Sequence, residues 1–111
     1  MHMFKILLTT AFCLTALVSP VSAEYPDKPI RMVVGYAPGG AADKLVRPII
    51  DRLARILKQP FVVDYKPGAG AALAAELTAK APADGYTLHI TDSGPMTILP
   101  HMRKLGYDPL S

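Results

Sequence analysis

The chain has 111 residues, with 12 lysines and arginines, 9 aspartates and glutamates, and a net charge of +3 at pH 7. Acidic residues are interspersed among the basic ones, as in Asp43-Lys44 and Asp51-Arg52, so there is no continuous basic stripe of the kind that binds nucleic acid. The single cysteine, Cys13, excludes a disulfide framework and a cysteine-based metal site.

The first 23 residues have the order of parts of a secretory signal peptide. Lys5 supplies a positive charge, residues 6–18 are apolar apart from three threonines, and Val21-Ser22-Ala23 offers small residues to a signal peptidase. The apolar run is shorter than the roughly 20 residues that span a bilayer. We therefore predict a signal peptide over residues 1–23, cleaved after Ala23, and a mature chain over residues 24–111.

The first predicted unit of the mature chain is a strand, a glycine turn and a helix. Ile30–Tyr36 is apolar and rich in β-branched residues, Pro38-Gly39-Gly40 forms the turn, and Ala41–Gln59 has helical spacing. Pro48 lies inside the helical stretch and predicts a kink or a late helix start. The predicted inward stripe is Leu45, Ile49, Leu53 and Ile56, widened by Val46, Ile50 and Leu57.

A second unit follows with the same order of parts. Phe61–Tyr65 is a predicted strand, residues 66–70 form a second glycine loop, and Ala71–Ala81 is a predicted helix. We expect Leu73, Leu77 and the intervening alanines of this helix to face inward. The predicted elements after it are a strand over Tyr86–Thr91 and a short helix over Met96–Met102, interrupted at Pro100.

The order strand, helix, strand, helix, strand predicts an α/β fold with a parallel sheet. Parallel sheets need cover on both faces, and only two of the predicted helices are long. We therefore expect the chain to be the N-terminal portion of a larger α/β lobe.

The two glycine loops are the most informative feature for function. Each follows a strand and opens a helix, so both should lie at the carboxyl ends of the strands, where open parallel sheets bind ligands. Free backbone N–H groups and the positive end of the helix dipole favour an anion there, and glycine lets it approach. Matched loops predict a carboxylate clamp made of main-chain donors, although ordinary turns remain an alternative interpretation.

Three side chains near these loops are further candidates for ligand binding. Asp43 either complements the helix dipole or orients a ligand. Tyr36 either lines the mouth of a pocket or packs at the strand end. Ser93, in the loop after the third strand, either donates to a ligand oxygen or is a plain turn residue.

The residues give no support for catalysis, a metal or a cofactor. His89 and His101 lack a carboxylate at the spacing typical of zinc sites. Ser93 lacks the context of a nucleophile elbow. The glycine loops also lack the lysine and the third glycine of nucleotide-binding motifs.

Several spaced motifs make the mature chain resemble the receptors of tripartite tricarboxylate transporters, also called Bug proteins. The resemblance spans nearly all of the mature chain. It is carried by Tyr25-Pro26-Asp27-Lys28-Pro29, Pro38-Gly39-Gly40-Ala41-Ala42-Asp43, Lys66-Pro67-Gly68-Ala69-Gly70, Ala83-Asp84-Gly85-Tyr86-Thr87-Leu88 and Leu105-Gly106-Tyr107-Asp108-Pro109.

The resemblance implies a periplasmic receptor with two α/β domains that close around a small carboxylate and deliver it to a membrane permease. Family ligands include dicarboxylates, tricarboxylates, amino acids and aromatic acids. The implied ligand-binding positions are Pro38, Gly39, Gly40, Ala41, Ala42 and Asp43, with Pro67, Gly68, Ala69 and Gly70 opposite.

Two departures from the family pattern bear on the site. Tyr65 stands where the family usually has a small polar residue, and Ala71-Ala72 stands where it commonly has glycine and asparagine. The chain also matches only about the first third of a full receptor. A single lobe leaves one side of a ligand in water, which predicts weak affinity.

The leading interpretation is thus the N-terminal part of the first lobe of a periplasmic solute-binding receptor. One alternative is a truncated remnant without function. Another is an enzyme that binds a phosphorylated substrate.

Overall fold

The computed structural model describes residues 24–110. The predicted signal peptide, its cleavage site after Ala23 and Cys13 lie outside the described residues. Among residues 24–110, no helix combines the length and the apolar character that crossing a bilayer requires.

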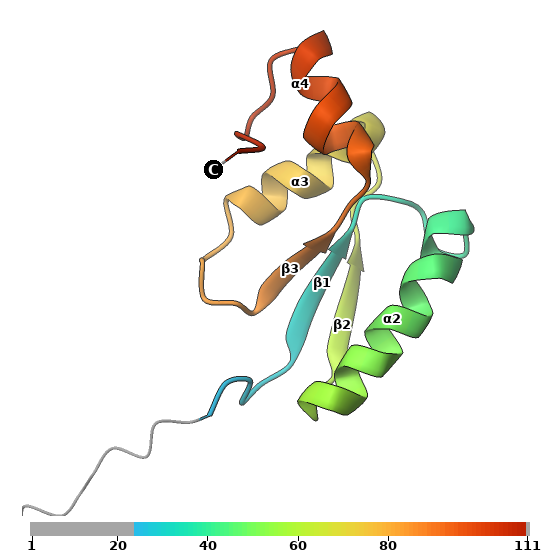
Figure 1. Ribbon diagram of the computed structural model, residues 1–111, viewed down its shortest axis with the longest axis vertical. Helices are drawn as coiled ribbons and strands as arrows, with labels where there is room; N and C mark the ends of the chain where they lie inside the picture. The colour runs from blue at the N-terminus through green and yellow to red at the C-terminus, as the bar shows by residue number, and fades with distance from the viewer. Residues whose placement is uncertain (1–23, 111) are drawn as a thin grey trace, which may run out of the picture.

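The elements alternate as the sequence predicts (Figure 1). They are β1 (Ile30–Val34), α2 (Ala41–Leu57), β2 (Phe61–Tyr65), the 3-10 turn η1 (Ala69–Ala71), α3 (Ala72–Ala79), β3 (Thr87–Ile90), the π-helical turn η2 (Gly94–Ile98) and α4 (Leu99–Met102). β1 and β3 are shorter than predicted. α2 begins at Ala41 and runs through Pro48 as one helix, so the predicted late start is wrong.

The sheet in the described part of the chain is parallel, with the strand order β2-β1-β3. Val34 of β1 is in register with Tyr65 of β2 on one side and with Ile90 of β3 on the other. The predicted α/β class with a parallel sheet is confirmed. All the carboxyl ends lie at one edge, and the loops after β1 and β2 leave from neighbouring strands.

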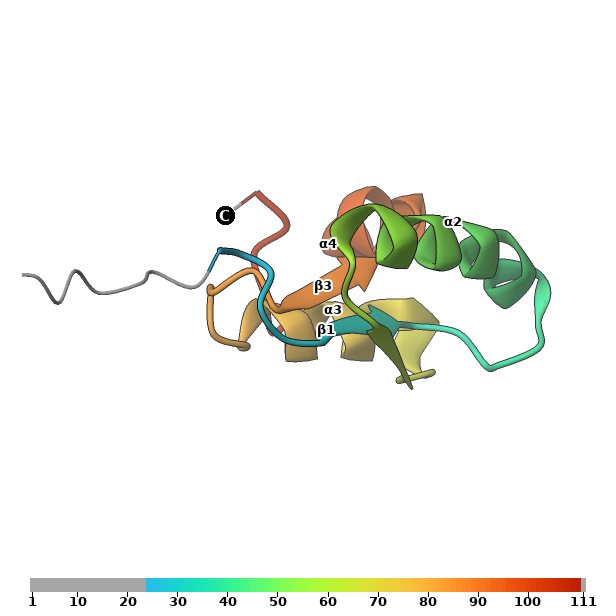
Figure 2. The same cartoon turned by 90° about the horizontal axis from the view of Figure 1, so that it is seen from below.

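Helices cover both faces of the sheet. α2 lies on one face and α3 on the other (Figure 2). On the α2 face, Met32 and Val34 form a buried cluster with Val46 and Ile50 of the helix. Successive strand residues point to opposite faces, so Val33, which is also buried, points toward α3.

The predicted inward face of α2 is partly correct: the residues predicted to form its centre are largely exposed, and two of those predicted to widen it are buried. Leu45 is 73% exposed, Ile49 50% and Ile56 62%, whereas Val46 and Ile50 are buried. The two apolar rows differ by about 100° around the helix, and both repeat at the same spacing. The burial of Asp43, which shares the inward face with Val46 and Ile50, helps to select the row that packs on the sheet.

α3 packs through its alanines and not through its leucines. Ala72, Ala74 and Ala75 are buried, while Leu73 and Leu77 stay about two-fifths exposed. The predicted inward position of the two leucines is therefore wrong. The physical reason is a close approach of α3 to the sheet, since a Cβ added to Gly35 would lie 2.5 Å from the Cβ of Ala71.

Candidate functional site

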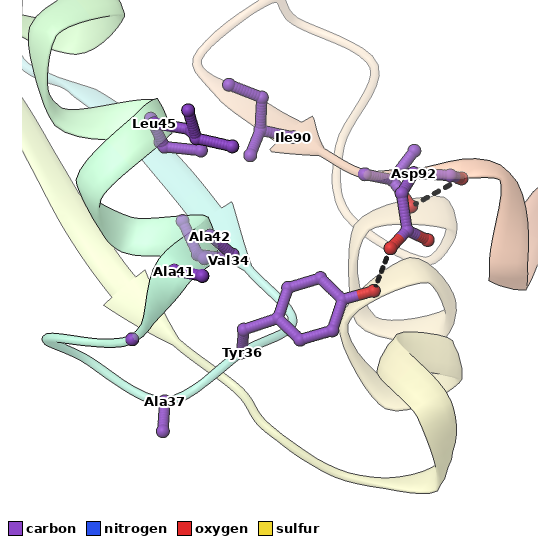
Figure 3. Close-up of a pocket in the computed structure, with 11 residues that line it drawn as sticks. Val34, Tyr36, Ala37, Ala41, Ala42, Leu45, Ile90 and Asp92 are labelled. Carbon is purple, nitrogen blue, oxygen red and sulfur yellow. Dashed lines mark hydrogen bonds between the residues drawn. The ribbon is translucent and has the colours of Figure 1, made fainter.

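A groove of about 610 Å³ opens at the carboxyl edge of the sheet, on the face that α2 covers (Figure 3). Three segments line it: the end of β1, the start of α2 and the end of β3. The lining residues are Val34, Tyr36, Ala37, Gly40, Ala41, Ala42, Leu45, Val46, Ile90, Thr91 and Asp92. Its walls are therefore mostly apolar, and its polar groups lie at the start of α2 and around Tyr36 and Asp92.

The first glycine loop presents the N-terminus of α2 to this groove. Gly39 has a φ of +77°, a conformation that favours glycine, and the extended Gly40 then precedes the first helical turn. No side chain of residues 24–110 caps this helix. The amides of Ala41 and Ala42 have no acceptor within the helix and belong to residues that line the groove. They carry the positive end of the helix dipole, which favours an anion.

Asp43 is turned into the loop behind the groove. Its carboxylate accepts hydrogen bonds from the Gly39 N–H at 2.8 Å, from Arg47 Nε at 3.1 Å and from the Tyr65 hydroxyl at 2.6 Å. The hydroxyl of Tyr65 in turn accepts one from Arg47 at 2.6 Å. These bonds, that of Tyr65 first, lower the pKa of Asp43. The carboxylate thus fixes the shape of the loop, and Asp43 as a residue is only 6% exposed.

A second carboxylate, Asp92, lies at the rim of the groove. Tyr36 donates its hydroxyl hydrogen to Asp92 across the rim (Figure 3), and the Gly94 N–H donates to Asp92 Oδ1 at 2.9 Å. These two bonds, that of Tyr36 first, lower the pKa of Asp92. The bond to Asp92 also raises the pKa of Tyr36. Asp92 is therefore ionised at neutral pH and gives this end of the groove a negative charge.

The second glycine loop leaves the neighbouring strand and turns sharply. Gly68, Ala69, Gly70 and Ala71 all have positive φ, two of them without being glycine. The carbonyl oxygen of Ala69 accepts a hydrogen bond from Arg103 Nη2 at 2.7 Å. This loop does not contribute to the lining of the large groove, and Ala69 instead lines a smaller pocket of about 170 Å³ beside α3.

The predicted site residues thus fall into three groups. Tyr36, Gly40, Ala41 and Ala42 line the groove, whereas Pro38, Gly39 and Asp43 belong to the same loop but do not line it. Pro67, Gly68, Ala69 and Gly70 lie in the loop of the adjacent strand. Ser93 is exposed next to Asp92, and its carbonyl oxygen accepts a hydrogen bond from Thr97.

The apolar wall of the groove and Asp92 are not among the site residues predicted from the sequence. Val34, Val46 and Ile90 have the same appearance in a sequence as ordinary core residues. Asp92, however, directly precedes Ser93 at the carboxyl end of a strand, and that position marks it as a candidate by the reasoning that selected Ser93.

His89 lies on β3 and is half-buried. Its Nδ1 is 3.0 Å from the carbonyl oxygen of Val33, on the neighbouring strand. Within residues 24–110, no three histidine, aspartate or glutamate side chains lie close enough together to hold a metal ion.

Comparison with known proteins gives consistent matches. A family profile described as "Tripartite tricarboxylate transporter family receptor" matches residues 45–111. Protein BugT of Bordetella pertussis is 44% identical over 78 residues, which cover 69% of this chain and 24% of BugT. The chain spans between 21% and 31% of the length of the curated relatives that it matches.

Three solved structures have closely similar folds. The periplasmic binding protein BugD has a TM-score of 0.72 at 34% identity, covering 77% of this chain and 28% of its own. MatC from Rhodopseudomonas palustris with bound malate has a TM-score of 0.70 at 35% identity, and the match covers 77% of this chain and 29% of MatC. An R. palustris protein with adipate has a TM-score of 0.69 at 35% identity, and the match covers 79% of this chain and 30% of that protein.

Proposed function

The chain belongs to the tripartite tricarboxylate transporter receptor family, and from this premise we propose that it binds a small carboxylate in the groove at the start of α2. The observation that carries the proposal is the uncapped N-terminus of this helix, which faces the groove. Two main-chain amides and the helix dipole there suit a carboxylate without any lysine or arginine. Relatives of similar fold with malate and with adipate support the same ligand class.

In this proposal the chain is a binding module and not an enzyme. It forms the N-terminal portion of the first lobe of a two-lobe periplasmic receptor, and its transport partner is the membrane permease of the family. Ala41 and Ala42 hold the carboxylate, while Pro38, Gly39 and Asp43 shape the loop. Pro67 to Gly70 and Ser93 remain predicted contributors from the neighbouring loops.

One substitution tests the main-chain site without disturbing the helix. Ala41→Pro removes one amide donor at the first helical position, where proline is tolerated, and the extended Gly40 before it suits a following proline. We expect unchanged or slightly higher thermal stability without ligand. Carboxylate affinity should fall about tenfold or more, because a hydrogen bond to a charged group contributes about 1.5–3 kcal/mol.

The measurement is thermal unfolding of the full gene product, purified from the periplasm of a bacterial host, with and without a panel of carboxylates. Binding to the folded state raises the melting temperature. Ala41→Gly is the matched control, because it keeps the amide and should retain the ligand-dependent shift. An equal shift in wild type and Ala41→Pro would refute the amide site, and no shift with any carboxylate would refute the proposed function.

A further inference from the structure

The groove has two chemically different ends. The start of α2, with Ala41 and Ala42, lies at one end, and the carboxylate of Asp92 lies at the other, on the far side of an apolar wall (Figure 3). We infer that the ligand is a monocarboxylate with an apolar body and a hydrogen-bond donor, a hydroxyl or an ammonium group, at its far end. This inference rests on the proposed function and narrows it, because a dicarboxylate would bring a second anion to Asp92.

The charge of Asp92 carries the argument. Its carboxylate accepts one hydrogen bond from Tyr36 and one from the Gly94 N–H, and a carboxylate has about four lone-pair sites. It therefore keeps acceptor capacity for a donor on the ligand. A ligand carboxylate at this end would meet a like charge without a compensating donor.

No lysine or arginine among the lining residues offsets that charge. Two basic residues lie near the start of α2, and neither lines the groove: Arg47 is paired with Asp43 and also donates to Tyr65, and Lys44 precedes Leu45. Among the lining residues, the positive potential therefore comes from the start of α2. A single carboxylate matches this end, and a neutral or cationic group matches the other.

The wall between the two ends selects an apolar body. Val34, Val46 and Ile90 line it, together with Leu45, which is 73% exposed. A methylene chain would cover part of the Leu45 side chain. A densely hydroxylated acid would bury polar groups against this wall without partners.

Four acids of six carbons isolate the chemistry of the far end. They are hexanoate, 6-hydroxyhexanoate, 6-aminohexanoate and adipate. All four share a carboxylate at one end of an unbranched chain, and adipate carries a second carboxylate at the other end. Affinities for the full gene product are measured by calorimetry and by the shift in melting temperature. We expect 6-hydroxyhexanoate and 6-aminohexanoate to bind most tightly, hexanoate more weakly, and adipate at least tenfold more weakly than 6-hydroxyhexanoate.

Asp92→Asn tests the cause of this order. The variant removes the charge but keeps an acceptor for Tyr36, so adipate should gain about tenfold relative to 6-hydroxyhexanoate, and 6-aminohexanoate should lose its advantage over hexanoate. Asp51→Asn is the matched control. It removes the same charge from an exposed position of α2 that does not line the groove, and the order of affinities should stay unchanged.

The outcomes separate this inference from the function on which it rests. If adipate binds the wild type as tightly as 6-hydroxyhexanoate, the inference is wrong, although carboxylate binding stands. The same conclusion follows if Asp92→Asn and Asp51→Asn have equal effects. If none of the four acids binds but another carboxylate of the panel does, the inference fails and the proposed function stands. If no carboxylate of the panel binds, both fail.

Discussion

At the scale of single residues, Gly35 and Ala71 set how closely α3 approaches the sheet. Gly35 follows the last residue of β1, and a Cβ placed on it would lie 2.5 Å from the Cβ and 3.0 Å from the Cα of Ala71. Ala71 is buried and has a φ of +66°, a conformation that costs an alanine about 1 kcal/mol. The pair thus has the smaller residue on the strand side and the strained residue on the helix side.

Exchanging the two residues tests this packing. Gly35→Ala should lower the free energy of unfolding by about 1–3 kcal/mol, the usual cost of overpacking. In the double variant with Ala71→Gly, much of this loss should be recovered, because the clashing methyl group is absent and the left-handed conformation suits glycine. Chemical denaturation of the four members of the cycle measures the coupling, and a coupling near zero would contradict the close approach.

At the scale of elements, Tyr65 joins the end of β2 to the start of α2. Its hydroxyl group donates to Asp43 and accepts from Arg47, and Asp43 holds the N–H of Gly39 in the first loop. The tyrosine that departs from the family pattern is therefore the direct partner of the acidic residue after that loop. The position still carries a polar group, but this group is directed at Asp43.

The lowered pKa of Asp43 makes this link dependent on pH. A carboxylate whose folded-state pKa lies below its ordinary value of 3.8 stabilises the fold above that value, and the stabilisation is lost as the pH falls through the folded-state pKa. Because the Tyr65 hydroxyl is the largest cause of the shift, Tyr65→Phe should lose part of this stabilisation. The free energies of unfolding of variant and wild type should therefore converge in acid.

The measurement is denaturant unfolding at a series of values from about pH 2 to about pH 7. Asp64 and Asp92 also have lowered pKa values, so the difference between variant and wild type is the quantity to follow. Tyr25→Phe is the control, because that hydroxyl group donates to the carbonyl oxygen of Gly85 and not to a carboxylate. A difference for Tyr65→Phe that stays constant with pH would contradict the link.

At the scale of the whole molecule, the parallel order β2-β1-β3 gathers the functional groups at one edge. The loop after β1 opens α2, and the end of β3 brings Asp92 to the same groove. The solved structures with a similar fold include a periplasmic binding protein. This relationship supports our proposal that the chain is exported.

Export can be checked on the gene product itself. Expressed in full in a Gram-negative host, the chain should appear in the periplasmic fraction, and its mass should correspond to a polypeptide that begins at Glu24. This outcome follows from the small residues that end at Ala23. Replacing Ala23 with a bulky residue such as phenylalanine should block or move the cleavage, and an uncleaved wild-type chain in the cytoplasm would contradict the prediction.

The order of elements, the parallel class and the two glycine loops follow from the sequence alone, because strand and helix periodicity, glycine and proline act over a few neighbouring residues. Tertiary structure decided which apolar row of α2 is buried, and that alanines, not leucines, anchor α3. It also decided that Asp43 bonds to Tyr65, 22 residues away, and Tyr36 to Asp92, 56 residues away. Such pairings depend on how segments distant in sequence pack together. The spacing of residues within one segment does not determine that packing.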